Sequence, residues 1–250
     1  MARRSDHFLS HLGFTFEVRE TDRVGTATLI PELCVPGTDR PHIGVLATLA
    51  DIVAGFPNER PTVATSDLSV HVWRTPRTRT VEVTSSTLKA GRRLIVTESL
   101  FTEPGVDEPF GCSLATFMAA PDDFPAHAPP FPPENSPTID GPLADRIGAR
   151  IIAPGTVELP RSPFITNGED GTIQGGLIAL LAELGAESLL DGYAVRDLDV
   201  RYLNGVRVGP AVTTSTVIGR DERDITVRVR IDEPDRPIAH VIAVCRPVSS

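Results

Sequence analysis

The sequence has no long hydrophobic run. No stretch reaches the roughly eighteen uncharged apolar residues that a membrane-spanning helix needs. The first residues, Met-Ala-Arg-Arg-Ser-Asp, lack the apolar core of a signal peptide. We therefore expect a cytoplasmic protein with no membrane partner.

Cysteine is scarce, and several catalytic motifs are absent. The three cysteines, Cys34, Cys112 and Cys245, are odd in number and show no Cys-x-x-Cys spacing, so they predict buried thiols rather than disulfides or a zinc site. There is no serine nucleophile elbow, phosphate loop or metal-ligand set, which argues against α/β-hydrolases, nucleotide-binding proteins and metalloenzymes. We expect no metal and no cofactor.

Positive charge is also in short supply. The net charge of −9 disfavours binding to nucleic acid, because the phosphates would be repelled by the mean field of the protein. The hydrophobic fraction of 40% and the charged fraction of 23% are those of an ordinary folded protein. A small-molecule substrate is therefore more consistent with the composition than a nucleic acid.

A proline-rich segment divides the 250 residues near their middle. Proline lacks an amide donor and fixes its backbone angle, so residues 121–142 cannot form a central strand or a helix interior. We predict a linker over 121–142 between an N-terminal unit, 1–120, and a C-terminal unit, 143–250.

The two halves share a series of similar segments. The apolar segment HIGVLATLADIVAG from His42 is matched by QGGLIALLAELGAE from Gln174. Downstream, SDLSVHVWR from Ser66 is matched by RDLDVRYLN from Arg196 at nearly the same separation along the chain. A third pair, beginning at Val81 and Ala211, shares its strand, turn and strand spacing. Three blocks in one order predict a tandem repeat.

Each half predicts an α+β unit in which a curved antiparallel sheet wraps around one central helix. The helical segments are apolar around most of their circumference, which is typical of a buried helix. The following segments alternate in hydrophobicity, as strands do when one face of a sheet is buried. A single unit would leave one sheet edge open, and pairing with the second unit would cover that edge.

Two carboxylates stand at equivalent positions of these helices. Asp51 and Glu183 each lie nine residues after the start of their segment and are the ionisable residues near its middle. Burial raises the free energy of a charged carboxylate, which is a common way to obtain a general base or nucleophile near neutral pH. The alternative is that each carboxylate only bonds a neighbouring backbone group. Their matched positions favour function.

Glycine occurs where each helix begins, within residues 41–44 and 173–176. First-turn amides have no acceptor within the helix and lie at the positive end of its dipole. Such amides can donate to the oxyanion of an acyl-transfer reaction, although glycine there also serves close packing.

These residues resemble the hot-dog fold thioesterases of the phenylacetyl-CoA and 4-hydroxybenzoyl-CoA type, over residues 10–119 and 143–247. The family pattern is His-Gly-Gly followed by six residues, a carboxylate at the ninth position after His, and then a Thr/Ser-x-Asp-Leu strand. The resemblance implies a double hot-dog fold, hydrolysis of an acyl-CoA thioester with CoA as leaving group, and assembly into homo-oligomers.

By this resemblance the stronger site combines residues of both halves. Glu183 would act as base or nucleophile, with the Gly175 amide as oxyanion donor and Asn167 and Thr65 holding water and substrate. A weaker site would use Asp51, with Val195 in place of the hydroxyl residue. The remaining helix-start residues would contact the substrate: Gln174, Gly176, His42, Ile43 and Gly44.

Two other functions remain open. A hydratase or dehydratase on this fold would need a catalytic histidine paired with a carboxylate across the site, and His42 is the helix-start histidine. A non-catalytic protein that binds acyl-CoA is the alternative from another class, favoured if Asp51 and Glu183 are both engaged in structural hydrogen bonds.

Overall fold

The computed structural model describes residues 7–19, 22–55, 63–119, 137–167 and 171–248. The first part of the chain contains η1 (Phe8–His11), β1 (Phe14–Val18), β2 (Asp22–Thr28), η2 (Pro31–Leu33), α1 (Ile43–Gly55), β3 (Val63–Val72), β4 (Thr80–Ala90), β5 (Leu94–Glu103) and β6 (Val106–Ala119). The second contains α2 (Leu143–Arg146), β7 (Arg150–Ala153), β8 (Thr156–Leu159), α3 (Gly175–Leu189), β9 (Tyr193–Tyr202), β10 (Ala211–Arg220), β11 (Ile225–Glu233) and β12 (Arg236–Pro247). The two helices predicted to be central, α1 and α3, begin within one residue of their predicted starts.

The strands form one antiparallel sheet in the order β1-β2-β4-β5-β6-β3-β9-β12-β11-β10-β8-β7. Read from either end, the sheet places the strands of each half in the same sequence. The halves meet where β3 pairs with β9, from Asp67 opposite Arg201 to His71 opposite Asp197. The predicted edge pairing is therefore found, but its result is one continuous twelve-stranded sheet rather than two separate sheets.

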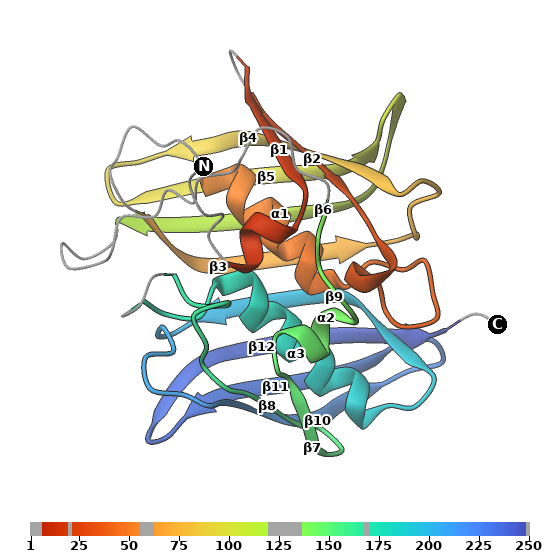
Figure 1. Ribbon diagram of the computed structural model, residues 1–250, viewed down its shortest axis with the longest axis vertical. Coiled ribbons are helices and arrows are strands. Elements are labelled where there is room, and N and C mark those ends of the chain that lie inside the picture. Colours follow the sequence, from red (N-terminus) through yellow and green to blue (C-terminus); the bar gives the residue numbers. More distant parts are fainter. Residues whose placement is uncertain (1–6, 20–21, 56–62, 120–136, 168–170, 249–250) are drawn as a thin grey trace.

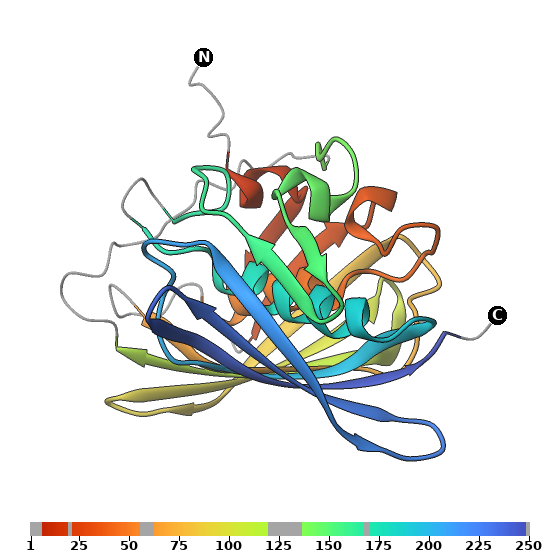
Figure 2. The same cartoon turned by 90° about the horizontal axis from the view of Figure 1, so that it is seen from below.

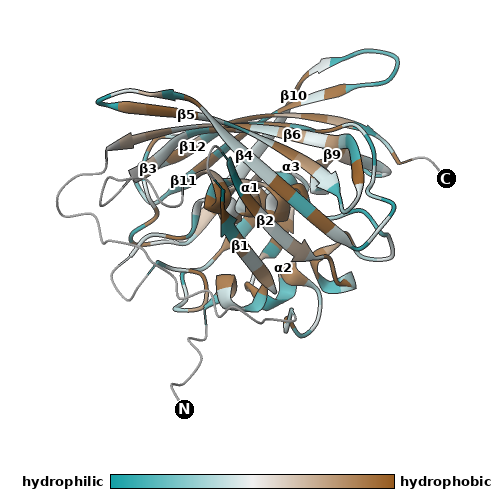
Figure 3. Cartoon of the chain, turned by 90° about the horizontal axis from the view of Figure 1, so that it is seen from above, coloured by the Kyte–Doolittle hydropathy of each residue, from teal (hydrophilic) through white to brown (hydrophobic). Residues whose placement is uncertain are grey.

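Helices α1 and α3 lie side by side on one face of this sheet (Figure 1). The sheet curves around them when the molecule is turned (Figure 2). Hydrophobic residues are concentrated where the two helices lie inside the curve (Figure 3). In α1, all residues are buried except Asp51 and Gly55. The core thus lies between the sheet and the helix pair, as a helix without a polar face requires.

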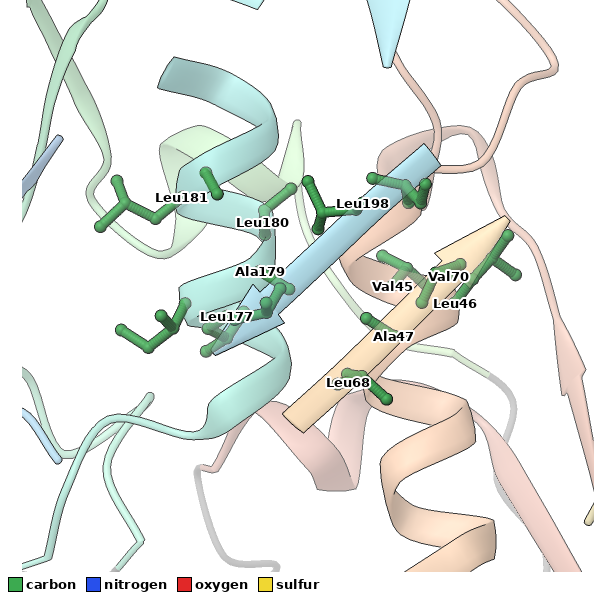
Figure 4. Packing of buried hydrophobic residues seen from close by; sticks show 14 of the residues in the cluster. Val45, Leu46, Ala47, Leu68, Val70, Leu177, Ala179, Leu180, Leu181 and Leu198 are labelled. Carbon is green, nitrogen blue, oxygen red and sulfur yellow. The ribbon is translucent and has the colours of Figure 1, made fainter. Parts of the chain in front are cut away.

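The two helices pack against each other in antiparallel directions. A side chain at Gly44, early in α1, would lie 2.4 Å from the backbone of Leu180 in α3, and one at Gly176, early in α3, would lie 1.9 Å from the hydroxyl of Thr48. Glycine at both places allows this close approach. Figure 4 shows aliphatic side chains of both helices meeting those of β3 and β9. The part of α1 that carries Asp51 consequently lies beside the start of α3, and the part of α3 that carries Glu183 lies beside the start of α1.

A buried glutamate recurs at matched loops of the two halves. Glu103 accepts hydrogen bonds from the backbone amides of Arg77 and Thr78 at 2.5 and 2.9 Å. Glu233 accepts them from the amides of residues 207–209, between 2.9 and 3.1 Å. Glu103 and Glu233 have the same separation along the chain as the segments from Ser66 and Arg196, and so do their amide partners. This correspondence extends the similarity beyond the segments recognised in the sequence.

Some expectations concern the periphery of the fold. Most of the predicted linker, 121–142, lies outside the described residues, so the division into units 1–120 and 143–250 stays a prediction. Cys34 and Cys245 are buried as predicted, but Cys112 is only partly buried on its strand, so that part of the prediction was wrong. Among the described residues, no helix has the length and hydrophobicity to cross a membrane.

Candidate active site

Two carboxylate sites lie on the contact between α1 and α3. Because the helices are antiparallel, Glu183 of α3 faces the start of α1, and Asp51 of α1 approaches the start of α3. The two sites differ in burial: Glu183 is 0% exposed, whereas Asp51 retains partial exposure. Their hydrogen-bond partners differ as well.

The Glu183 carboxylate is fully engaged. One oxygen, Oε2, accepts a hydrogen bond from the Gly44 amide at 3.0 Å. The other, Oε1, lies 3.2 Å from Nδ1 of His42 and 3.7 Å from the guanidinium of Arg40. A first-turn amide of α1 is thus occupied by a side chain of the neighbouring helix.

Arg40 extends this cluster to a second glutamate. Its Nη2 donates to Oε1 of Glu187 at 2.7 Å, and its Nη1 donates to the carbonyl of Val195 at 3.3 Å. Glu187 also accepts from the Val195 amide at 2.9 Å. The result is a buried, hydrogen-bonded network of two acids and two bases, which sequence inspection did not anticipate because Arg40 lies outside the recognised motifs.

The charges in this network stabilise one another. Burial acts to raise the pKa of Glu183, but His42, Arg40 and the Gly44 amide outweigh it and hold that pKa below its ordinary value. Burial acts to lower the pKa of His42, and Glu183 outweighs it, so the pKa of the imidazole is raised. Each of the two groups therefore favours the charged form of the other.

The Asp51 site is simpler. The Thr65 hydroxyl, at the start of β3, donates to Oδ1 of Asp51 at 2.6 Å. Burial raises the pKa of Asp51 to about 6, although the Thr65 hydrogen bond acts in the opposite direction. A carboxylate with such a pKa is ionised at neutral pH and still basic enough to accept a proton.

The first-turn amides of α3 face this site. Gln174 caps the helix, its Oε1 accepting from the Leu177 amide at 3.1 Å. Within the part of the chain that the structure describes, the amides of Gly175 and Gly176 have no hydrogen-bond partner. The helix dipole also places partial positive charge here, beside the Asp51 carboxylate.

A tyrosine completes the Asp51 site. The Tyr202 hydroxyl, at the end of β9, donates to the Gly175 carbonyl at 2.9 Å. Burial raises the pKa of Tyr202 well above its ordinary value, and the nearby Asp51 charge raises it further. One signal in the sequence could have found this residue: the equivalent position in the first half, at the end of β3, is Val72.

The structure groups the predicted site residues differently from the sequence. Thr65 binds Asp51 and not Glu183. Gly175 lies eight residues before Glu183 on the same helix, which corresponds to about 12 Å along the axis. The composite expected for Glu183, Gly175 and Thr65 is therefore not assembled in one place, because each helix start faces the carboxylate of the other helix.

The remaining predicted residues have mainly structural surroundings. Gly44 and Gly176 lie at the close helix contact, and Ile43 is buried. His42 belongs to the Glu183 network, while Asn167 precedes α3, its amide donating to the Thr172 carbonyl at 2.9 Å. Any role of these residues in binding or catalysis stays a prediction.

No protein-family model matches the sequence, and no curated protein matches it. Solved structures do match. A conserved protein of unknown function with hot dog fold from Alicyclobacillus acidocaldarius superposes with a TM-score of 0.62 at 11% identity, covering 94% of this chain and 96% of that one. The chain has the hot dog fold.

Other structures with the same arrangement are thioesterases. The acyl-CoA thioesterase II TesB2 of Mycobacterium marinum has a TM-score of 0.58 at 11% identity, over 94% of this chain and 96% of that chain. The 12:0-ACP thioesterase of Umbellularia californica has a TM-score of 0.63 at 14% identity, over 91% of this chain and 94% of that chain. The resemblance drawn from the sequence to hot dog thioesterases is confirmed in the fold.

Proposed function

We propose that the protein hydrolyses acyl thioesters at the Asp51 site. The observation that carries this proposal is the pairing of Asp51, a partly exposed residue, with first-turn amides of the neighbouring helix that have no partner among the described residues. The structural similarity to thioesterases supports the same reaction class. The Glu183 site, which the sequence favoured, has its carboxylate already bound.

In the proposed reaction Asp51 acts as general base. Its carboxylate takes a proton from water, and the water oxygen attacks the thioester carbon to form the new C–O bond. The carbonyl oxygen becomes an oxyanion and accepts a hydrogen bond from the Gly176 amide, with the Gly175 amide adjacent. Collapse of this intermediate breaks the C–S bond, and the thiolate takes the proton from Asp51.

The first half of the chain supports the choice of the Gly176 amide. Its equivalent, the Gly44 amide, points across the helix contact and donates to Glu183 at 3.0 Å. Aspartate is shorter than glutamate by one methylene, a C–C bond of about 1.5 Å. The shorter Asp51 would not reach the Gly176 amide as Glu183 reaches the Gly44 amide, which leaves the Gly176 N–H available to the substrate oxygen.

Thr65 and Asn167 would serve this site rather than the Glu183 site. Thr65 holds one oxygen of Asp51 and so orients the other oxygen toward water. Asn167 precedes the helix that supplies the amides, and we assign it to substrate contact. This proposal assigns Thr65, Gly175 and Asn167 to the Asp51 site and leaves Glu183 with a structural role.

We further propose that the chain is a double hot-dog in which each half is one unit of a tandem repeat. The palindromic strand order, the matched helices and the paired Glu103 and Glu233 loops support a common origin of the halves. Each half would contribute to the Asp51 site: the carboxylate and Thr65 from the first, the amides from the second.

The substrate we propose is an acyl-CoA in the cytoplasm, with no cofactor and with assembly of chains into homo-oligomers. One similar structure is named an acyl-CoA thioesterase, which supports CoA as the carrier of the acyl group. Another is named an ACP thioesterase, so an acyl-carrier protein is the competing carrier. Because CoA is anionic and the net charge of the protein is −9, binding of an acyl-CoA would require basic side chains gathered at the site.

One observation favours a second candidate. The 3.2 Å contact between His42 and Glu183 is the histidine and carboxylate pairing that a hydratase would use. Both side chains are buried, however, at 3% and 0% exposure, and Glu183 is also bound to Gly44. Substrate would have to displace this network, so we favour thioester hydrolysis.

The test is thiol release from a panel of short, long and aromatic acyl-CoAs, with the matching acyl-carrier proteins assayed in parallel. Asp51→Asn keeps the size of the side chain but removes the base, so we expect kcat to fall about 10²- to 10⁴-fold. Asp67→Asn, a surface aspartate paired with Arg201 near the same site, is the control and should retain activity.

Other outcomes have definite meanings. Saturable acyl-CoA binding without thiol release would favour the non-catalytic alternative, since both carboxylates do accept hydrogen bonds. Hydration of an enoyl-CoA that is lost in His42→Gln would favour the hydratase. Thiol release that survives Asp51→Asn and disappears in Glu183→Gln, in folded protein, would return the site to Glu183.

A further inference from the structure

Tyr202 ends β9 beside the junction with β3, since the preceding residue, Arg201, pairs with Asp67. Its ring packs against the core, and its hydroxyl reaches the first residue of α3, donating to the Gly175 carbonyl at 2.9 Å. Nothing in the catalytic scheme above uses this hydroxyl. Its position is nevertheless inside the Asp51 site.

The carbonyl that Tyr202 binds belongs to the same peptide unit as the Gly176 amide. A peptide unit is planar and trans, so its C=O and N–H point in opposite directions. A hydrogen bond that fixes the Gly175 oxygen therefore also fixes the direction of the Gly176 N–H. The hydrogen bond polarises the unit as well, which makes the N–H a stronger donor.

This restraint matters because glycine flanks the peptide on both sides. Glycine has more backbone freedom than any other residue, and first-turn peptides lack the amide hydrogen bonds of a helix interior. A side chain at Gly175 would meet Tyr202 at 3.6 Å, an ordinary contact, whereas one at Gly176 would lie 1.9 Å from the Thr48 hydroxyl, so close packing restrains the peptide on the Gly176 side only. The tyrosine hydroxyl adds a second hydrogen bond to the Gly175 carbonyl, which also accepts the helical hydrogen bond from the amide four residues later.

The first half of the chain shows the complementary solution. There the equivalent residue is Val72, which has no hydroxyl, and the Gly44 amide is fixed by Glu183 at 3.0 Å. The equivalent peptide units are thus contacted from other elements in different ways: Glu183 binds the amide of Gly44 in the first half, and Tyr202 binds the carbonyl of Gly175 in the second. Only the second arrangement leaves the N–H available to a ligand.

We propose that Tyr202 is a positioning residue that aims and strengthens the Gly176 amide as oxyanion donor, an inference that rests on the proposed thioester hydrolysis. It does not touch the reacting atoms. Its effect should appear in the transition state, when charge develops on the substrate oxygen, and not in ground-state binding.

Tyr202→Phe tests the proposal, because it removes the hydroxyl and keeps the ring. On the best acyl-CoA of the panel we expect kcat to fall about tenfold with KM changed less than about twofold, a smaller effect than losing an oxyanion donor outright. Tyr193→Phe is the matched control: it is the other tyrosine of the chain, on the same strand and also packed against the core. It should match wild type.

The possible results separate the two proposals. Wild-type protein that releases no thiol overturns the proposed hydrolysis, and this inference with it. An active wild type with unchanged kcat in Tyr202→Phe overturns the inference alone. A rise in KM at constant kcat, or equal losses in Tyr202→Phe and Tyr193→Phe, would indicate a packing role and also overturn it.

Discussion

The Asp51 and Glu183 sites occupy equivalent places but have opposite electrostatics. Glu183 is buried among His42, Arg40 and an amide that hold its pKa below the ordinary value. Among the described residues, the Asp51 carboxylate accepts a hydrogen bond only from the Thr65 hydroxyl, and burial raises its pKa to about 6. One carboxylate therefore contributes stability in its charged form, and the other is charged at a cost in stability. Functional groups are commonly the ones held at such a cost.

The largest expected difference between the sites is in stability. Glu183→Gln leaves His42 and Arg40 without their shared anion, and we expect the free energy of unfolding at pH 7 to fall by about 3–5 kcal/mol. Asp51→Asn removes a charge that burial disfavours, and we expect a gain of up to about 3 kcal/mol at pH 8. Denaturant unfolding of both variants and wild type measures these changes.

The two effects should also depend on pH in opposite ways. Because the pKa of Glu183 is lowered on folding, its contribution is present above about pH 4.3 and is lost as pH falls further, so Glu183→Gln should converge on wild type in acid. Because the pKa of Asp51 is raised, its penalty appears as pH rises from about 4 through 6, so Asp51→Asn should match wild type near pH 4. A change in the free energy of unfolding with the same sign in both variants would contradict the comparison.

Sequence patterns predicted the elements and the two carboxylates, but not which groups they meet. Helical periodicity and the repeat located α1 and α3 and the equivalence of Asp51 with Glu183. Which helix start faces each carboxylate depends on the antiparallel crossing at Gly44 and Gly176, and no local pattern contains that information. The sequence-based site paired Glu183 with the start of its own helix, whereas in the structure Glu183 lies beside the start of α1.

The partners that distinguish the sites were also beyond local patterns. Arg40 lies 147 residues from Glu187 along the chain, and Tyr202 lies 27 residues from Gly175 on a different element. Neither belongs to a recognisable motif, since each acts through a tertiary contact. Comparing the halves position by position would have singled out Tyr202, because a hydroxyl replaces the aliphatic Val72 only in the second half.

Adding one methylene to Asp51 should give the Asp51 site the same contact between carboxylate and amide that the Glu183 site has. Asp51→Glu keeps the charge but extends the carboxylate by a C–C bond of about 1.5 Å, toward the Gly176 amide. Since Glu183 binds the equivalent Gly44 amide at 3.0 Å, we expect the new carboxylate to occupy the oxyanion position. Thiol release should fall about 10²-fold, comparable to losing an oxyanion donor.

The control for this variant is Asp51→Asn. Asp51→Asn should lose activity because it lacks the base, and Asp51→Glu because its longer side chain occupies the amide. Only Asp51→Glu keeps an ionisable group at the site, so a residual rate in that variant should still depend on pH. Activity of Asp51→Glu close to that of wild type would show that the separation between carboxylate and amide is not what distinguishes the two sites.

The smallest predicted effect is the pH dependence of the wild-type rate. Asp51 must be ionised to accept a proton from water, and its pKa is raised to about 6, so kcat/KM should be constant above that pH and fall about tenfold per unit below it. Initial rates of thiol release between pH 4.5 and 8.5, at about constant ionic strength, measure this profile.

Thr65→Val removes the hydrogen bond that acts to lower the pKa of Asp51, so it should move the inflection of this profile to higher pH. If the inflection of the pH profile moves instead in Arg40→Met, which disturbs the Glu183 network, the catalytic base would lie in the Glu183 site.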